Sequence, residues 1–224
     1  FKAQRAEFQD LIYQNIRLSG ASAQPLAMQV GLGTQFAATA ANFSRGPLQA
    51  TSNPLDLAIA GDGFFKVEMN NGTTAYTRDG SFKVNGTGEL VTNDGYRVVP
   101  NLTVPTGSTA LTISPDGTVS AKVPGQDDPQ IIGQLQITLF SNPSGLTRMG
   151  QNLYTAGGAS GEATEVTPGD NGGGQIQSGF LEGSNVEIVV EMVRMITAQR
   201  AYEINSKAIQ TADDMLGILN NLKR

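Results

Sequence analysis

The sequence predicts a mainly β protein that ends in one long α-helix. Short segments of alternating apolar residues, separated by glycine turns, fill the middle of the chain, and a helical apolar period runs through its C-terminal end. A small-residue composition before the β segments indicates an extended arm. We therefore expect three parts: an extended N-terminal arm or connector over residues 1–53, a β-hairpin-rich outer domain over residues 54–183, and a coiled-coil-like helix over residues 184–224.

The N-terminal part fits more than one structure. Residues with helical spacing are Phe8, Leu11, Ile12 and Ile16, and residues that suit an extended segment are Phe1, Phe8 and Tyr13. Residues 19–53 are rich in Gly, Ala, Ser and Gln, a composition that predicts few internal contacts. They form either a flexible linker or an arm that becomes ordered only against other subunits.

The middle of the chain repeats a hairpin signal. The predicted turns are Gly61-Asp62-Gly63, Asn71-Gly72, Asp79-Gly80, Asn85-Gly86, Asp94-Gly95 and Asp116-Gly117. Such pairs are typical of tight hairpin turns, so we interpret their aspartates as structural. In QLQITLF, Leu135, Ile137 and Leu139 alternate with polar residues, which predicts a half-buried strand. By contrast, GDNGGGQ at residues 169–175 has the composition of a flexible loop.

The composition argues against most enzyme chemistry. The 224 residues include no Cys and no His, which removes thiol nucleophiles, imidazole bases, disulfides and the usual zinc sites. No phosphate-binding loop, EF-hand spacing or nucleophile elbow occurs. We therefore expect no catalytic residue, no cofactor and no metal site, although a carbohydrate-active enzyme with paired carboxylates is an alternative.

Charge and hydropathy limit the partners. The net charge of -5 disfavours nucleic acid and anionic membrane surfaces. No apolar run reaches the ~18–20 residues of a membrane span. The start, FKAQRAEFQD, lacks the basic and apolar regions of a secretory signal peptide, so we expect no cleavable signal.

The C-terminal stretch predicts a helix that needs an external partner. Ser184 and Glu187 have the spacing of a capping box, which predicts the helix start. One apolar stripe follows at steps of three and four: Val190, Val193, Thr197, Ala201, Ile204, Ala208, Ala212, Met215, Leu219 and Leu222. A second row comprises Val189, Met192, Ile196, Ile209, Leu216 and Ile218. At ~1.5 Å per residue the helix is about 55–60 Å long. The helix is therefore too long for its own domain to cover, and its apolar residues lie on two sides. The alternative is that the helix folds back over that domain.

Several motifs together resemble those of bacterial flagellar rod and hook proteins. They are FK at residues 1–2, LAIAGDGFFKV at 57–67, YTRDGSFKV at 76–84, ELVTNDGY at 89–96 and SNVEIVVEMVRMITAQRAYEINSKAIQTADDM at 184–215. Within this family, residues 152–185 and the run from Gln199 to Leu216 look most like the distal rod subunits. The helix that the family carries in front of the FK motif is absent from this sequence.

The resemblance implies a structural role. It implies a distal rod subunit that polymerises helically into a rigid, hollow drive shaft, with the C-terminal helix in the inner layer. Implied partners are further copies of the chain, proximal rod and hook subunits, and the surrounding periplasmic and outer-membrane rings, with no nucleic acid and no small-molecule substrate. The implied location is the basal body, from periplasm to outer membrane, after type III export. Alternatives are a hook or proximal rod subunit, or a fibre or adhesin β-domain with a terminal coiled coil.

Overall fold

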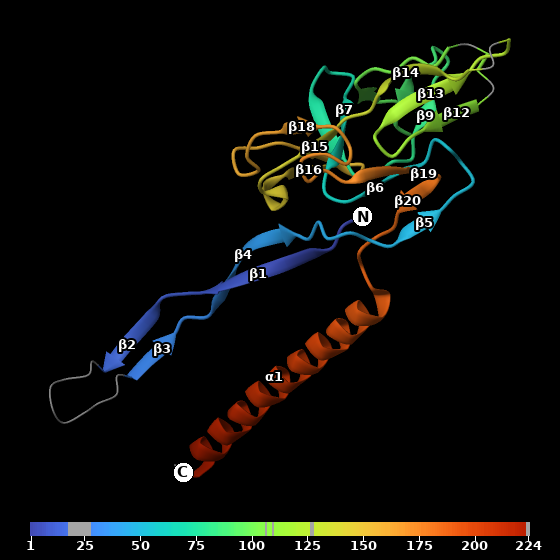
Figure 1. The fold of residues 1–224 in the computed structure, drawn as a ribbon. Helices are drawn as coiled ribbons and strands as arrows, with labels where there is room; N and C mark the ends of the chain where they lie inside the picture. Colours follow the sequence, from blue (N-terminus) through green and yellow to red (C-terminus); the bar gives the residue numbers. More distant parts are fainter. Residues whose placement is uncertain (18–27, 106, 109, 126–127, 223–224) are drawn as a thin grey trace. The chain divides into compact units, whose positions relative to one another are not determined.

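A computed structural model describes residues 1–17, 28–105, 107–108, 110–125 and 128–222, and their side chains except at 15–17, 28 and 220–222. The chain divides into two compact units, Phe1–Asn185 and Val186–Arg224, called here the β unit and the helix unit. Figure 1 shows strands throughout the first and one long helix in the second. This is the predicted fold class, mainly β with a C-terminal helix.

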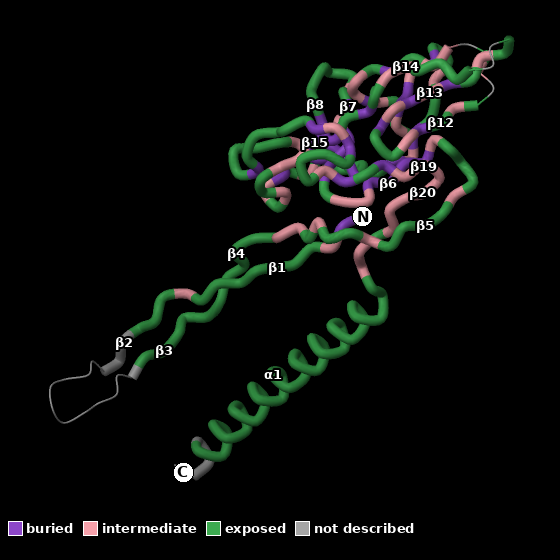
Figure 2. Tube along the Cα trace, in the orientation of Figure 1, coloured by how far each residue is buried: buried purple, intermediate pink, exposed green. Residues whose placement is uncertain are grey.

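The N-terminal segment forms an antiparallel ribbon made of two successive strand pairs. The strands β1 to β4 are called the ribbon here. Its strands are β1 (Gln4–Asp10), β2 (Tyr13–Arg17), β3 (Met28–Gly31) and β4 (Thr34–Ala41). β1 pairs with β4 and β2 pairs with β3, both antiparallel. Figure 2 shows that the ribbon is exposed over almost all of its described length.

The extended prediction for the chain start is confirmed and the helical one is wrong. The flexible-linker interpretation is wrong for β3 and β4, and residues 18–27 of that segment lie outside the described residues.

The rest of the β unit is built from short strands. They are β5 (Leu48–Ala50), β6 (Leu57–Ala60), β7 (Phe64–Glu68), β8 (Thr74–Thr77), β9 (Lys83–Val84), β10 (Leu90–Val91), β11 (Arg97–Val99), β12 (Ala110–Ile113), β13 (Thr118–Lys122), β14 (Gln130–Gln134), β15 (Ile137–Leu139), β16 (Thr147–Gly150), β17 (Leu153–Thr155), β18 (Thr164–Val166), β19 (Gln175–Ser178) and β20 (Phe180–Glu182). The main sheet has the order β16-β17-β8-β7-β11-β10-β9, and β15 pairs with both β7 and β18. β12, β13 and β14 form a second sheet.

Two further strand pairs close the β unit on itself. β5 pairs with β20, and β6 pairs with β19. Because β19 and β20 are the last strands of the unit, the two strands that follow the ribbon lie beside its last two strands. The apolar core follows from this closure, since Leu57, Phe65 and Ile176 are all almost completely buried in one cluster. Full burial of one such side chain contributes about 1.5–3 kcal/mol.

Four of the six predicted hairpin turns join paired strands. The turns at Asn71-Gly72, Asn85-Gly86, Asp94-Gly95 and Asp116-Gly117 connect β7–β8, β9–β10, β10–β11 and β12–β13, as expected. The other two predictions are wrong. At Gly61-Asp62-Gly63 the flanking β6 and β7 are not partners, and at Asp79-Gly80 neither are β8 and β9. At both places the glycine has no side chain to keep another backbone segment away, so two backbones come close together and no hairpin forms.

The contact at Gly61 also shows that the flexible loop predicted at residues 169–175 is wrong. A Cβ built on Gly61 would lie 2.2 Å from the Cα of Gly174, which is far inside contact distance. The N–H of Gly174 donates to the carbonyl of Asp62 over 2.9 Å, and Asp62 forms a parallel bridge with Gly173. The glycine cluster is therefore a backbone junction between distant segments, not a flexible loop.

The helix unit consists of one helix, α1 (Ile188–Leu222). It begins four positions after Ser184, so the predicted capping box does not start the helix. The N–H of Glu191 donates to the carbonyl of Glu187 over 3.1 Å, which is the spacing of a helical bond. Within the described part of the chain, no helix is long and apolar enough to cross a membrane.

Candidate assembly surfaces

The predicted helix stripe is exposed wherever its side chains are described. Among its large apolar side chains, the exposed fractions range from 38% at Val190 to 66% at Ile204. The remaining exposed members are Val193, Thr197, Ala201, Ala208, Ala212, Met215 and Leu219. Leu222 is the last residue of α1, and its side chain lies outside the described part. The contacts predicted for these ten residues remain a prediction.

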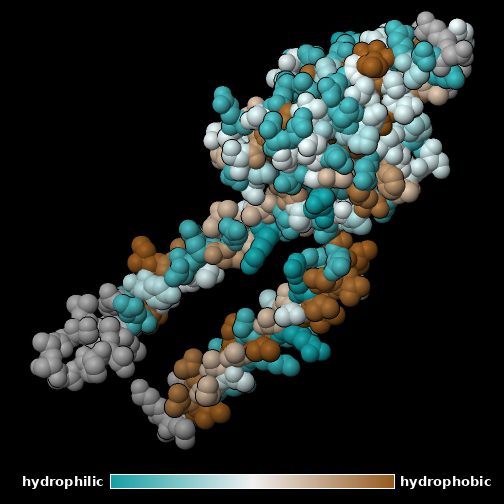
Figure 3. Space-filling view, viewed as in Figure 1, coloured by the Kyte–Doolittle hydropathy of each residue, from teal (hydrophilic) through white to brown (hydrophobic). Residues whose placement is uncertain are grey.

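Apolar side chains occupy more than one side of α1. The second row is exposed as well, at Val189, Met192, Ile196, Ile209, Leu216 and Ile218. Figure 3 shows hydrophobic residues gathered along the length of the helix. Its polar surface carries an ion pair between Glu191 and Arg194 at 2.6 Å, one turn apart. Such an exposed pair contributes at most about 0.5 kcal/mol, so α1 has little stabilisation of its own.

The ribbon presents a second apolar surface. Phe8 and Phe36 lie directly opposite each other on β1 and β4, with ring centroids 6.1 Å apart in an edge-to-face arrangement. Both are largely exposed, at 69% and 58%. Ile12 and Leu32 are exposed too. Sequence reasoning missed this aromatic pair, because Phe36 lies in a small-residue segment without strand periodicity.

One buried carboxylate joins the ribbon to the rest of the β unit. Glu182, the last residue of β20, accepts from the Lys2 ammonium and, at 2.9 Å, from Nε of Arg78. The backbone N–H of Gly46 donates to the same carboxylate at 3.0 Å. The side chains of Lys2, Glu182 and Arg78 are only 6%, 3% and 8% exposed. Sequence reasoning missed this cluster, since nothing in the pattern links residues so far apart.

The burial and the charges of this cluster shift the pKa values of Glu182 and Lys2. Burial alone would raise the pKa of Glu182, but the Arg78 guanidinium and the hydrogen bonds from Lys2 and Gly46 outweigh burial and hold that pKa below its usual value. Burial lowers the pKa of Lys2, although the bond to Glu182 opposes this effect. Arg78 also donates through Nη1 to the carbonyls of Gly61 and Gly63, at 2.9 and 2.7 Å. Nη2 of Arg78 lies 2.9 Å from the Glu182 carboxylate as an ion pair, although it has no hydrogen-bond partner of good geometry. The cluster is thus a buried structural joint held by charge and by hydrogen bonds.

Asn185 fastens the end of the β unit to the base of the ribbon. Its Oδ1 accepts from the N–H of Ala3 at 2.8 Å, and its Nδ2 donates to the carbonyls of Asn42 and Ser44 at 3.0 and 3.2 Å. Just before it, the N–H of Gly183 donates to the carbonyl of Pro47 at 2.9 Å. These bonds hold residues 183–185 against the base of the ribbon, the backbone bends at Asn185, and α1 starts three residues later.

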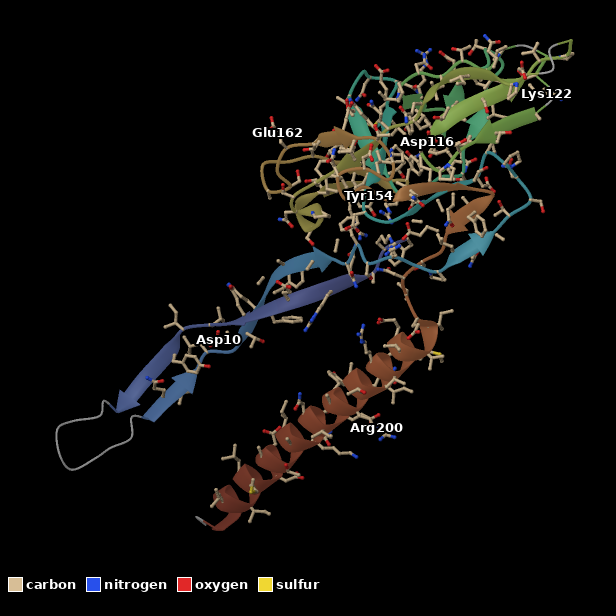
Figure 4. The ribbon with its side chains drawn as sticks, viewed as in Figure 1. Asp10, Asp116, Lys122, Tyr154, Glu162 and Arg200 are labelled. Carbon is tan, nitrogen blue, oxygen red and sulfur yellow. The ribbon has the colours of Figure 1, made fainter. Side chains whose placement is uncertain are left out.

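Two of the turn aspartates, Asp79 and Asp116, are held by hydrogen bonds. Asp79 accepts from Ser81 and Asn152, and Asp116 accepts from Thr118, which is how turn aspartates are normally bonded. Burial would raise the pKa of Asp79, but these hydrogen bonds outweigh it and lower the pKa, the opposite of what a general acid requires. Figure 4 shows the labelled Asp116 and Glu162 at separate places in the β unit. Among the described residues, no three potential metal ligands come together.

Two family models match the chain. The model described as "Flagellar hook protein FlgE/F/G D1 domain" matches residues 58–121, and that described as "Flagellar basal body rod FlgEFG protein C-terminal" matches residues 177–222. The first covers β6 to β13, and the second covers β20 and α1. The two matches therefore fall on both units.

Curated relatives match along the full length. The flagellar basal-body rod protein FlgG of Borreliella burgdorferi is 51% identical over 100% of this chain and 87% of its own length. The FlgG proteins of Caulobacter vibrioides and Bacillus subtilis are 44% and 41% identical, again over 100% of this chain, and over 87% and 88% of their own lengths. The FlgF rod protein of Caulobacter vibrioides is 33% identical over 88% of this chain. Similarity to FlgG is therefore both higher and more complete.

Proposed function

Because this chain belongs to the FlgG family of flagellar basal-body rod proteins, we propose that it builds the distal rod by burying α1 against neighbouring copies of itself. The observation that carries this proposal is the exposure of the apolar residues along α1. Each Val, Ile or Leu that becomes buried contributes about 1.5–3 kcal/mol. A helix with apolar residues on more than one side gains this stabilisation fully only with several neighbours.

The three sequence segments then have separate roles. Residues 184–224 form the inner layer of a hollow helical polymer, and residues 54–183 form its outer layer. The extended arm, residues 1–53, bridges adjacent subunits through exposed side chains such as Phe8 and Phe36. Stiffness comes from many such contacts repeated along the polymer, so torque passes from motor to hook without covalent cross-links.

The remaining partners follow from the position of a distal rod. The polymer joins proximal rod subunits at one end and hook subunits at the other, and it turns inside the periplasmic and outer-membrane rings. It extends from the periplasm to the outer membrane, and its subunits are exported through the flagellar type III channel. Its role is structural and requires no catalytic residue or cofactor.

The proposal is tested by placing a charge in the helix stripe. Ile204→Asp puts a carboxylate on the stripe, where assembly would bury it without a partner. We expect polymerisation of the purified chain, followed by light scattering and electron microscopy, to be abolished. The melting transition of the β unit should stay in place, because Ile204 belongs to the helix unit.

Ser206→Asp is the matched control. It introduces the same side chain two residues along α1, about 200° around the helix from Ile204 and outside the stripe. Polymerisation should continue in this variant. Normal polymerisation of Ile204→Asp would refute the proposed interface. Loss of β-unit melting in Ile204→Asp would mean instead that the helix stabilises its own domain.

A further inference from the structure

Asparagine followed by glycine occurs three times in the chain, at Asn71-Gly72, Asn85-Gly86 and Asn171-Gly172. This dipeptide can lose ammonia without an enzyme, because glycine has no side chain to hinder attack by its own backbone nitrogen on the preceding side-chain amide. The reaction requires that the amide is free to turn and that the glycine N–H is not bound to an acceptor. The structure holds the three asparagines differently, so their reactivities should differ.

The first of the three is held within its own turn. Oδ1 of Asn71 accepts from the N–H of Thr73 at 3.1 Å and from the Thr73 hydroxyl. The attacking group is engaged as well, because the N–H of Gly72 donates to the carbonyl of Met69 at 2.8 Å. Both reacting groups must therefore break hydrogen bonds before they can meet.

The second asparagine is held by more bonds. Oδ1 of Asn85 accepts from the N–H groups of Thr87 and Glu89, at 3.0 and 2.8 Å, and from the Thr87 hydroxyl at 2.6 Å. Its Nδ2 donates to the Glu89 carboxylate at 2.9 Å. Each bond that must break slows the reaction about two- to tenfold, so we expect Asn85 to be the most strongly protected of the three.

The third asparagine lacks such bonds. Within the part of the chain that the structure describes, the Asn171 side chain and the N–H of Gly172 have no hydrogen-bond partner in the protein. Both residues are exposed. The turn is closed by a bond from the N–H of Gly173 to the carbonyl of Asp170 at 2.8 Å, which involves neither reacting group. The backbone of Asn171 has a φ of 49°, which asparagine tolerates better than most residues.

We propose that Asn171 is the site at which the folded chain deamidates as it ages. The backbone nitrogen of Gly172 attacks Cγ of Asn171 and forms a new C–N bond. The side-chain nitrogen leaves as ammonia and takes the proton of the Gly172 N–H. Water then opens the cyclic imide at either of its carbonyls, which gives aspartate or isoaspartate. Water is the only co-reactant.

Deamidation at this position should weaken the nearby backbone junction. Isoaspartate adds an extra carbon atom to the main chain between Asp170 and Gly173, so it lengthens the turn that their bond closes. The junction starts directly after this turn, where Gly173 bridges Asp62 and the N–H of Gly174 donates to the Asp62 carbonyl at 2.9 Å. This inference does not rest on the proposed function, since all of these residues lie in the β unit.

The test follows ammonia loss at each asparagine in the full chain. Purified protein is incubated at mildly alkaline pH in heavy-oxygen water, which labels every imide that opens during the incubation, and is then digested for peptide mass spectrometry. The same measurement in urea gives the rate of each site in the unfolded chain. The ratio of the unfolded rate to the folded rate should be about one at Asn171, and at least about tenfold higher at Asn71 and Asn85.

Two variants test the cause and the consequence. Thr73→Ala removes the hydroxyl bond to Asn71 and should raise deamidation there about two- to tenfold, while the rate at Asn171 stays unchanged. Asn171→Gln places the amide one carbon further from the Gly172 nitrogen, which makes ring closure far slower. Each protein is compared with its own fresh sample. The midpoint of urea unfolding should fall on ageing in wild type and stay constant in Asn171→Gln.

The possible outcomes decide between these alternatives. Equal ratios at the three asparagines, or a faster reaction of the folded chain at Asn71 or Asn85, overturn the proposal. The same loss of stability on ageing in Asn171→Gln and in wild type overturns the link to the junction. A wild-type chain that deamidates at Asn171 without any fall in its urea midpoint overturns that link as well.

Discussion

Lys2 and Glu182 form a buried ion pair although 180 positions separate them in the sequence. Arg78 bonds to the same carboxylate, so Glu182 holds two cations from two distant segments. Lys2 also donates to the carbonyl of Ser44, at the base of the ribbon. One carboxylate thus ties together the start of the chain, the main sheet and the last strand of the β unit.

Removing that charge should destabilise the β unit strongly. Glu182→Gln leaves Lys2 and Arg78 buried without a counter-charge, and breaking a buried pair in this way costs about 3–5 kcal/mol. We expect a correspondingly lower free energy of unfolding in urea denaturation of the full chain. Glu165→Gln is the control, because Glu165 pairs with Lys66 in a partly exposed position. An exposed pair of this kind is worth less than about 1 kcal/mol. Equal losses in the two variants would contradict a special role for Glu182.

Acid should weaken the β unit through the same residue. The pKa of Glu182 is lower in the folded chain than its ordinary value, because Arg78, Lys2 and Gly46 outweigh the effect of burial. The resulting stabilisation is fully present above the unfolded-state pKa of about 4.3 and is lost as the pH falls through the lower folded-state value. Thermal melts across this range should therefore show a smaller acid-induced loss in Glu182→Gln than in wild type. The same loss in both proteins would assign the acid sensitivity to other carboxylates.

The backbone junction between Gly61 and Gly174 should not tolerate a methyl group. A Cβ on Gly174 would lie 2.5 Å from the Cα of Gly61 and 2.7 Å from a side-chain methyl carbon of Ile59. We expect Gly174→Ala to lower the free energy of unfolding by about 1–3 kcal/mol, as overpacking does. Gly158→Ala should be neutral by comparison, since nothing lies within 4 Å of a Cβ there. A neutral Gly174→Ala would show that the two segments can separate at little cost.

The aromatic pair of the ribbon should contribute to assembly and not to folding. Phe36→Ser removes an exposed ring, and if that ring is buried between subunits the critical concentration for polymerisation should rise at least about tenfold. The neighbouring Gln35→Ser points to the other side of the strand and should have little effect. Melting of the β unit should be the same in both. An unchanged critical concentration in Phe36→Ser would show that the Phe36 ring is not part of the interface between subunits.

Local patterns predicted the fold class because its elements carry local signals. The hairpins at Asn71-Gly72 and Asp116-Gly117 are specified by a few adjacent residues, and α1 is specified by its apolar period. The closure of the β unit was not predictable in this way, since β5 and β6 find their partners far along the chain. For the same reason Gly61-Asp62-Gly63 resembles a hairpin turn, although it serves a contact with a distant segment.

The candidate surfaces were predicted only in part. The stripe through Ile204 follows from spacing alone, because a helix places every third or fourth residue on one side. The joint at Glu182 and the hydrogen bonds of Asn185 depend on tertiary contacts of isolated polar residues, which have no periodic signature. The capping box shows the limit clearly, because a local signal at Ser184 does not mark the start of α1, which begins at Ile188.

The pairing of β5 and β6 with β20 and β19 also determines when the chain can fold. A ribosome must add residues up to Glu182 before these strands have partners, and Ile176 must be present before the core around Leu57 is filled. Shorter nascent chains therefore leave apolar side chains open to water. Contacts between such distant residues also slow folding, since a long loop must close before they form. The β5–β20 and β6–β19 pairs can therefore form only after residues up to Glu182 have been synthesised.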